Sequence, residues 1–281
     1  MSEATLHAER AAASVRLERA LVALGIMALV AAPFVIYPIF VMKMLCFALF
    51  ACAFNLLLGY TGLLSFGHAA FFGGAAYFCA YAVKAWGWPP EAGILLGAAG
   101  AAGMGLVVGF LAIRRQGIYF AMITLAMAQM FYFFCVQAPF TEGEDGIQGV
   151  PRGHLFGMLD LNVPMNMYFF VLAIFLIGLF AIWRIVNSPF GMILRSIREN
   201  ENRAISLGYS VGRYKLAAFV MSAALAGAGL VVGLENTLAT SGFPVTIATG
   251  VIFMVCVLIF RRGIVGEIYA RLLGREGGKS S

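Results

Sequence analysis

Long stretches without any charged side chain constrain this sequence more than any other feature. Neither Leu21–Met42 nor Met44–Val83 contains an Asp, Glu, Lys or Arg residue. Apolar runs of this length are typical of transmembrane helices, because about 20 helical residues cross the hydrocarbon core of a bilayer. Across the 281 residues, 62% are hydrophobic and 11% are charged, which is about half the charged fraction of an ordinary soluble domain. We therefore expect an all-α, polytopic transmembrane helical bundle.

The hydrophobic profile divides into about eight crossings. Their predicted ranges are 20–38, 44–59, 66–84, 92–112, 117–138, 165–184, 215–236 and 243–260. We interpret residues 1–19 as a cytoplasmic lead, 20–260 as the transmembrane domain and 261–281 as a cytoplasmic tail. The lead lacks the short apolar region and cleavage site of a signal peptide.

The basic residues indicate which side of the membrane each loop faces. With the N-terminus in the cytoplasm, all but three of the 19 Lys and Arg residues fall on the cytoplasmic side, the exceptions being Lys43, Lys84 and Arg152. Cytoplasmic loops are enriched in Lys and Arg. The sequence therefore predicts cytoplasmic N- and C-termini, an outer loop over 138–164 and an inner loop over 187–214. The net charge of +6 reflects this topology and does not indicate nucleic-acid binding.

The segment GYTGLLSFGH (59–68) places three glycines and several polar side chains inside an apolar region. Glycine in a helix interior costs about 1 kcal/mol relative to alanine. Small residues that let helices pack closely are one explanation. We favour a broken or re-entrant element near 59–68 that lines a transport pathway, because irregular backbone persists at membrane depth only where protein buries it or water lines it. The predicted substrate-pathway residues are Asn55, Gly59, Thr61, Gly62, Ser65, Gly67 and His68.

His68 and Ser65 leave two other functions open. An ionisable side chain inside a membrane is a candidate proton site, so a proton-coupled secondary transporter using His68 is one alternative. An intramembrane hydrolase with Ser65 as nucleophile is a less favoured alternative, since no G-x-S-x-G elbow surrounds this serine. We therefore expect a transport function and no catalysis by this chain.

Motifs for metals and nucleotides are absent from the sequence. No G-x-x-x-x-G-K-[ST] phosphate loop occurs, so any ATP would be bound by a partner. The outer loop lacks a D-x-D-x-D-G calcium motif, and the five cysteines lie in apolar runs without C-x-x-C spacing. We expect no metal and no cofactor, and interpret the cysteines as small buried hydrophobic residues.

Several stretches of the chain resemble one family of transport proteins. They are NLLLGYTGLLSFGHAAFFGGAAY (55–77), GIYFAMITLAMAQ (117–129), EDGIQGVPR (144–152) and SPFGMILRSIRENENRAISLGYSVGRYKLAAFVMSAALAGAGL (188–230). In this order they resemble the permease subunits of branched-chain amino-acid ABC importers. The resemblance implies a bacterial inner-membrane permease that pairs with a second homologous permease. It also implies two cytoplasmic ATPase subunits and a periplasmic substrate-binding protein.

The family resemblance has two departures and leaves the cargo open. Family members usually carry two more hydrophobic segments before the last crossing, and Arg261 stands where they have a proline. Few polar side chains lie near the predicted pathway, which would suit leucine, isoleucine, valine, amides or urea.

The inner loop is expected to couple the permease to its ATPases. Ile193, Ile197, Ala204 and Leu207 fall near helical spacing and Gly208 supplies a stop, so we predict one short amphipathic helix over 193–208. Within it, the positions of Glu201, Ala204 and Gly208 resemble the permease motif that docks into a groove on the ATPase. The predicted ATPase-coupling residues are Arg195, Arg198, Glu199, Glu201, Ala204 and Gly208.

Overall fold

A computed structural model describes most of the chain up to residue 230, within the seventh predicted crossing. The described residues are 20, 23–34, 36–115, 117–143, 147, 149–150, 154–155 and 159–230. The predicted lead 1–19, the eighth crossing 243–260 and the tail 261–281 lie outside the described residues.

The described chain is built mainly from helices, as predicted. The long helices are α2 (Pro38–Thr61), α3 (His68–Trp86), α4 (Pro90–Ala112), α5 (Ile118–Gln137), α6 (Pro164–Val186) and α9 (Val211–Leu230). Shorter elements are the helix Ala23–Phe34, α7 (Pro189–Glu199), α8 (Glu201–Ser206) and the 3-10 turn η1 (Pro139–Thr141). The prediction of an all-α chain missed one small antiparallel pair, β1 (His154–Leu155) and β2 (Leu159–Asp160), in which His154 lies opposite Asp160.

Proline and glycine set many of the helix boundaries. Pro38, Pro90 and Pro164 each stand in the first turn of a long helix, where a missing N–H costs nothing. The prediction of a crossing over 44–59 therefore began too late, and Lys43, expected in an outer loop, lies inside α2. Gly87 follows α3 in the left-handed conformation, with a φ of 64°.

Four of the described helices are long and apolar enough to cross a membrane, namely α2, α4, α5 and α6. Within the first predicted crossing, 20–38, the described helix is Ala23–Phe34. This helix is apolar but is too short to count among the four. These findings support a polytopic helical bundle.

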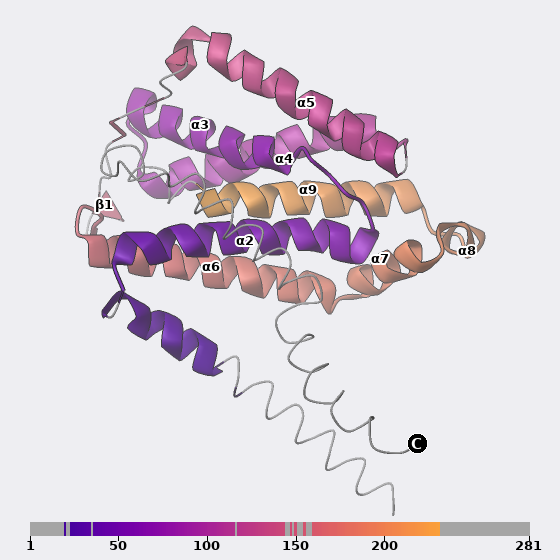
Figure 1. Cartoon of the computed structure of the whole chain (residues 1–281), viewed down its shortest axis with the longest axis horizontal. Coiled ribbons are helices and arrows are strands. Elements are labelled where there is room, and N and C mark those ends of the chain that lie inside the picture. The colour runs from indigo at the N-terminus through magenta and orange to yellow at the C-terminus, as the bar shows by residue number, and fades with distance from the viewer. Residues whose placement is uncertain are drawn as a thin grey trace, which may run out of the picture.

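Helix α9 passes through the middle of the bundle (Figure 1). It contacts α2 on one side and α3 and α4 on the other, while α6 packs on α2 and α5 lies outermost against α3 and α4. Small residues allow this close approach: a Cβ added at Gly105 of α4 would lie 2.6 Å from the Ala223 Cβ of α9. Phe219 and Ala226 of α9 are fully buried in the resulting core.

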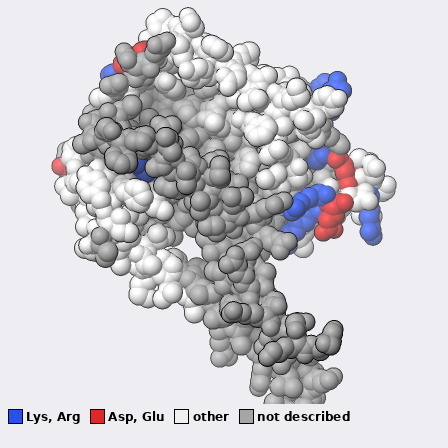
Figure 2. Space-filling model, in the orientation of Figure 1, with Lys and Arg blue, Asp and Glu red and all other residues white. Residues whose placement is uncertain are grey.

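The predicted outer and inner loops lie at opposite ends of the bundle (Figure 1). β1 is at one end, and α7 and α8 are at the other. At the β1 end, Lys84 in the last turn of α3 forms an ion pair of 2.5 Å with Glu142 after η1. Figure 2 shows that charged side chains gather at the end occupied by α7 and α8. This polarity agrees with the predicted separation of the two loops.

Candidate functional site

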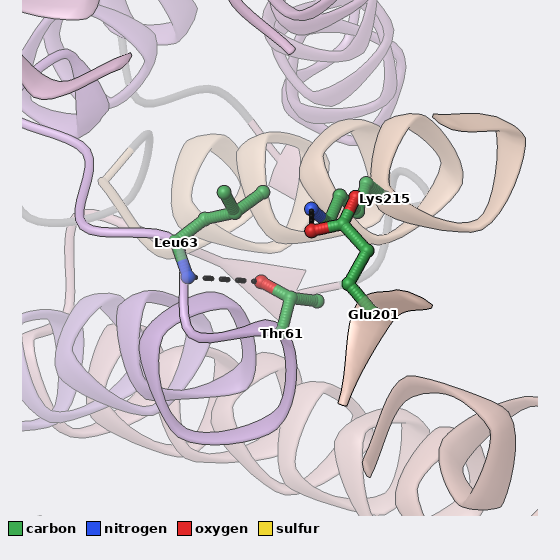
Figure 3. Close-up of polar contacts among 4 residues, drawn as sticks. All are labelled: Thr61, Leu63, Glu201 and Lys215. Carbon is green, nitrogen blue, oxygen red and sulfur yellow. Dashed lines mark hydrogen bonds and ion pairs between the residues drawn. The ribbon is translucent and has the colours of Figure 1, made fainter. Parts of the chain in front are cut away.

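The chain leaves helical geometry between α2 and α3, where the sequence predicted a break. Helix α2 ends at Thr61, and Gly62 adopts the left-handed conformation with a φ of 74°. The Thr61 hydroxyl donates to the Leu57 carbonyl at 2.6 Å and accepts from the Leu63 N–H at 3.3 Å (Figure 3). This side chain therefore gives a partner to the Leu63 N–H, which lies beyond the end of the helix.

Residues 62–67, here called the re-entrant segment, run back along the bundle towards its interior (Figure 1). The side chains alternate as in a strand, since Leu63 and Ser65 are buried whereas Leu64 and Phe66 are exposed. His68 follows directly after the segment. Its side chain is hydrogen-bonded to Ser222 of α9, whose hydroxyl donates to the Ala53 carbonyl of α2. Ala53 lies about 12 Å before the end of α2, at 1.5 Å per helical residue. The predicted break in helical structure is thus present, at residues 62–67 between α2 and α3.

Helix α5 holds the re-entrant segment in place through Thr124. The Phe66 N–H donates to the Thr124 hydroxyl at 3.2 Å, and this hydroxyl donates to the Ala121 carbonyl at 2.9 Å. Gly67 lies so close that an added Cβ would stand 2.9 Å from the Thr124 carbonyl oxygen. The Ser65 hydroxyl accepts from the Gly67 N–H at 3.2 Å. Thr124 was not predicted, because its partners are distant in the sequence.

The His68 side chain, at the start of α3, is buried and links this helix to α9 and α2. Its Nε2 lies 2.9 Å from the Ser222 hydroxyl, which itself donates to the Ala53 carbonyl at 2.5 Å. Because the single Ser222 proton is directed at Ala53, Nε2 carries a proton and donates to Ser222. The buried Nδ1 has no hydrogen-bond partner. The imidazole is edge-on to four phenyl rings, those of Phe50, Phe54, Phe71 and Phe219.

This setting bears on the two alternative functions. The imidazole of His68 is buried against aromatic rings and Ser222, with no charged group among these neighbours, which does not favour a proton relay. Ser65 and His68 have separate hydrogen-bond partners, so the structure does not join them as a nucleophile and its base. Neither alternative gains support from the geometry.

Asn55 and Gly59 face each other on consecutive turns of α2. An added Cβ at Gly59 would lie 2.8 Å from the Asn55 Oδ1 atom, so glycine makes room for the amide. Both residues are partly buried. The predicted pathway residues thus cluster along the end of α2 and the re-entrant segment.

A cavity of about 440 Å³ lies between α3, α4 and α5, next to the re-entrant segment. Gly67 and Thr124 form part of its wall, and apolar side chains such as Met104, Met127 and Phe131 line the rest. The Thr124 hydroxyl is already engaged by backbone groups. The cavity therefore suits an apolar group and offers little to the charged ends of an amino acid.

The inner loop forms two helices, so the prediction of one helix over 193–208 is wrong. Asn200, between α7 and α8, is extended, with φ and ψ of −154° and 100°. Its side chain accepts from the Arg203 N–H at 3.0 Å and caps α8. Asparagine is a preferred N-cap residue, so it ends one helix and begins the next. Gly208, with a φ of 87°, follows α8 as the predicted stop.

Helices α7 and α8, together called the elbow (189–206), enclose a small core of their own. Ile197, Ala204 and Val211 of α9 are buried together, whereas Leu207, predicted on the same face, is 68% exposed. Glu201 forms an ion pair of 2.7 Å with Lys215 of α9 (Figure 3). The Lys215 side chain is almost fully buried. Two predicted coupling residues, Glu201 and Ala204, thus hold the elbow against α9.

The arginines of α7 face the end of α2. Arg198 donates from Nη1 to the Gly59 carbonyl, and the Arg195 guanidinium carbon lies 5.1 Å from the centroid of the Tyr60 ring. Both arginines and Glu199 are exposed. The predicted pathway and coupling residues, chosen from separate parts of the sequence, therefore meet at this contact.

Comparisons with known proteins agree on one family. Residues 36–273 match the family profile described as "Branched-chain amino acid transport system / permease component". The chain is similar to the high-affinity branched-chain amino acid transport system permease protein LivM of Escherichia coli K12. The identity is 29% over 201 residues, which cover 62% of this chain and 46% of the relative. The LivM protein of Salmonella typhimurium LT2 matches to the same extent. The chain thus spans about half the length of these relatives, and no solved structure matches it.

Proposed function

Because this chain belongs to the family of branched-chain amino acid transport permeases, we propose that it forms half of the membrane pore of an ABC importer for these amino acids. A second homologous permease would supply the other half. Two cytoplasmic ATPases would bind and hydrolyse ATP, and a periplasmic protein would deliver the substrate. The observation that carries the proposal is the family match over most of the chain.

In this proposal the chain crosses a bacterial inner membrane about eight times, with both termini in the cytoplasm. Its support comes from the distribution of charge. The elbow and the start of α9 bring Arg195, Arg198, Arg203, Arg213 and Lys215 to one end of an apolar bundle. An excess of Lys and Arg is typical of the cytoplasmic side, so the elbow faces the ATPases and the η1–β1 region faces outwards.

The elbow and the adjoining Leu207 present a surface suited to a protein partner. Met192, Ile205 and Leu207 are 61%, 55% and 68% exposed, although they lie at the charged end of the molecule. Apolar side chains surrounded by charged ones are typical of a docking site. In this proposal these three side chains contact the ATPase, while Glu201 and Ala204 position the elbow from behind.

The re-entrant segment borders the route of the substrate in this proposal. It interrupts helical structure between α2 and α3, and it adjoins the apolar cavity between α3, α4 and α5. An apolar space of this kind would tolerate a branched aliphatic side chain. The substrate-binding protein would perform most of the selection.

The proposal is tested by reconstituting this chain into liposomes with its partner subunits and measuring uptake of labelled leucine. We expect uptake that requires both ATP and the binding protein. A matched complex whose ATPase lacks its phosphate-binding lysine serves as the control. Leucine uptake that persists in the control and follows an imposed proton gradient would contradict the proposal and favour a secondary transporter.

A further inference from the structure

The end of helix α2 is capped by side chains from a distant part of the chain. The last carbonyl groups of a helix lack intrahelical partners and carry the negative end of the helix dipole. Helix α2 has no basic residue in its own last turn. Arg198 of α7 donates to the Gly59 carbonyl in this turn, and Arg195 stacks over the neighbouring Tyr60 ring. Helix α7 therefore supplies the positive charge that α2 lacks.

The aliphatic part of Arg198 also lies beside Gly62, the first residue of the re-entrant segment. A Cβ added at Gly62 would lie 3.4 Å from the Arg198 Cγ, which is ordinary van der Waals contact. The aliphatic stem of Arg198 thus passes over the residue at which the chain turns back into the bundle. The Arg198 side chain thus bonds to the end of α2 and lies next to the start of the segment.

The far end of the re-entrant segment is fixed to two other helices. The Phe66 N–H is hydrogen-bonded to the Thr124 hydroxyl of α5, and the His68 side chain is hydrogen-bonded to the Ser222 hydroxyl of α9. A short extended segment held at both ends has little freedom to absorb a displacement, and close-packed interiors transmit strain. Movement at Gly62 is therefore expected to reach α5 and the wall of the cavity.

We propose that Arg198 is a positioning residue that transmits movement of the elbow to the re-entrant segment, and through Thr124 to α5. This inference rests on the proposed function, in which the ATPases move the elbow. The elbow can move as one body, because its small core and the Glu201–Lys215 ion pair join α7, α8 and the start of α9. Arg195 steadies the same contact through Tyr60.

The test compares Arg198→Ala and Arg198→Lys in the reconstituted complex, with Arg184→Ala as the control. Arg184 is an exposed arginine in the last turn of α6. We expect Arg198→Ala to retain its ATPase subunits and hydrolyse ATP. Its leucine uptake per ATP should fall about tenfold, the order of one charge-assisted hydrogen bond. Arg198→Lys keeps the positive charge and should recover much of the loss. Unchanged uptake per ATP in Arg198→Ala, or loss of its ATPase subunits, would overturn the inference.

A second measurement does not depend on the Arg198 variants assembling. Spin labels are placed on cysteines introduced at Ser206 of the elbow and Leu64 of the segment, both exposed, and each is paired with a label at an outer-end position, Phe140. In the complex with native Arg198, ATP binding should shift both distances. A shift at Ser206 without one at Leu64 would refute transmission. Failure of ATP-dependent uptake in the unmodified complex would refute the proposed function itself, which distinguishes the two results.

Discussion

Replacing Gly67 with alanine tests whether the re-entrant segment depends on its close approach to α5. The φ of Gly67 is −82°, so an alanine would not strain the backbone itself. The obstacle is steric: the new Cβ would lie 2.9 Å from the Thr124 carbonyl oxygen and 3.3 Å from the Thr124 Cβ. The first of these is a backbone atom within α5. Relief of the clash therefore requires the helix itself to shift, because moving a side chain would not remove it.

The expected cost follows from that shift. Forcing one extra carbon into a packed site costs about 1–3 kcal/mol. Movement of α5 would also lengthen the hydrogen bond from the Phe66 N–H to Thr124, at a further cost of about 1 kcal/mol. We therefore expect Gly67→Ala to destabilise the folded protein by about 2–4 kcal/mol and to lower uptake sharply.

Gly73 provides a matched control in α3, the helix that begins directly after Gly67. It lies inside α3, and an added Cβ there would meet no atom within 4 Å. Alanine at this position should be neutral, or stabilising by up to about 1 kcal/mol. The assay is the thermal unfolding midpoint of each purified variant, together with leucine uptake in liposomes. Equal midpoints and uptake for Gly67→Ala and Gly73→Ala would show that the segment is an ordinary packing surface and refute the reasoning.

Three further predictions address sidedness, the elbow and the buried histidine. A cysteine introduced at Gly149 should react with an impermeant thiol reagent in whole cells whereas one at Ser206 should not, and the reverse labelling would contradict the topology. Glu201→Arg should place two positive charges together and reduce co-purification of the ATPase. Adding Lys215→Glu should restore the co-purification. Failure of this second change to restore it would mean that Glu201 contacts the ATPase directly. His68→Gln retains a donor for the neighbouring serine but cannot titrate, so uptake should keep its pH dependence in liposomes. Abolished uptake with normal assembly would instead support a proton site at His68.

The sequence predicted the helical bundle and the break near 59–68 because both depend on local patterns. Charge-free runs indicate membrane helices, and the left-handed Gly62 is a local conformational requirement. The partners of the break were not predictable in this way. Thr124 and Ser222 lie 58 and 154 residues from the groups they bond, so no local spacing in the sequence connects them. Likewise, apolar spacing suggested one helix in the elbow, whereas the capping side chain of Asn200 divides it.

The structure gives a physical reason for the polar side chains in GYTGLLSFGH. A chain that leaves helical geometry inside a membrane exposes N–H and C=O groups that water cannot satisfy. Thr61 serves the Leu57 carbonyl and the Leu63 N–H, and Ser65 serves the Gly67 N–H. These hydroxyls are therefore occupied by the backbone and are not free to bind cargo in this conformation. Their role in transport, on the proposal made above, is to keep a non-helical segment stable enough to move as a unit when the elbow pulls on its first residue.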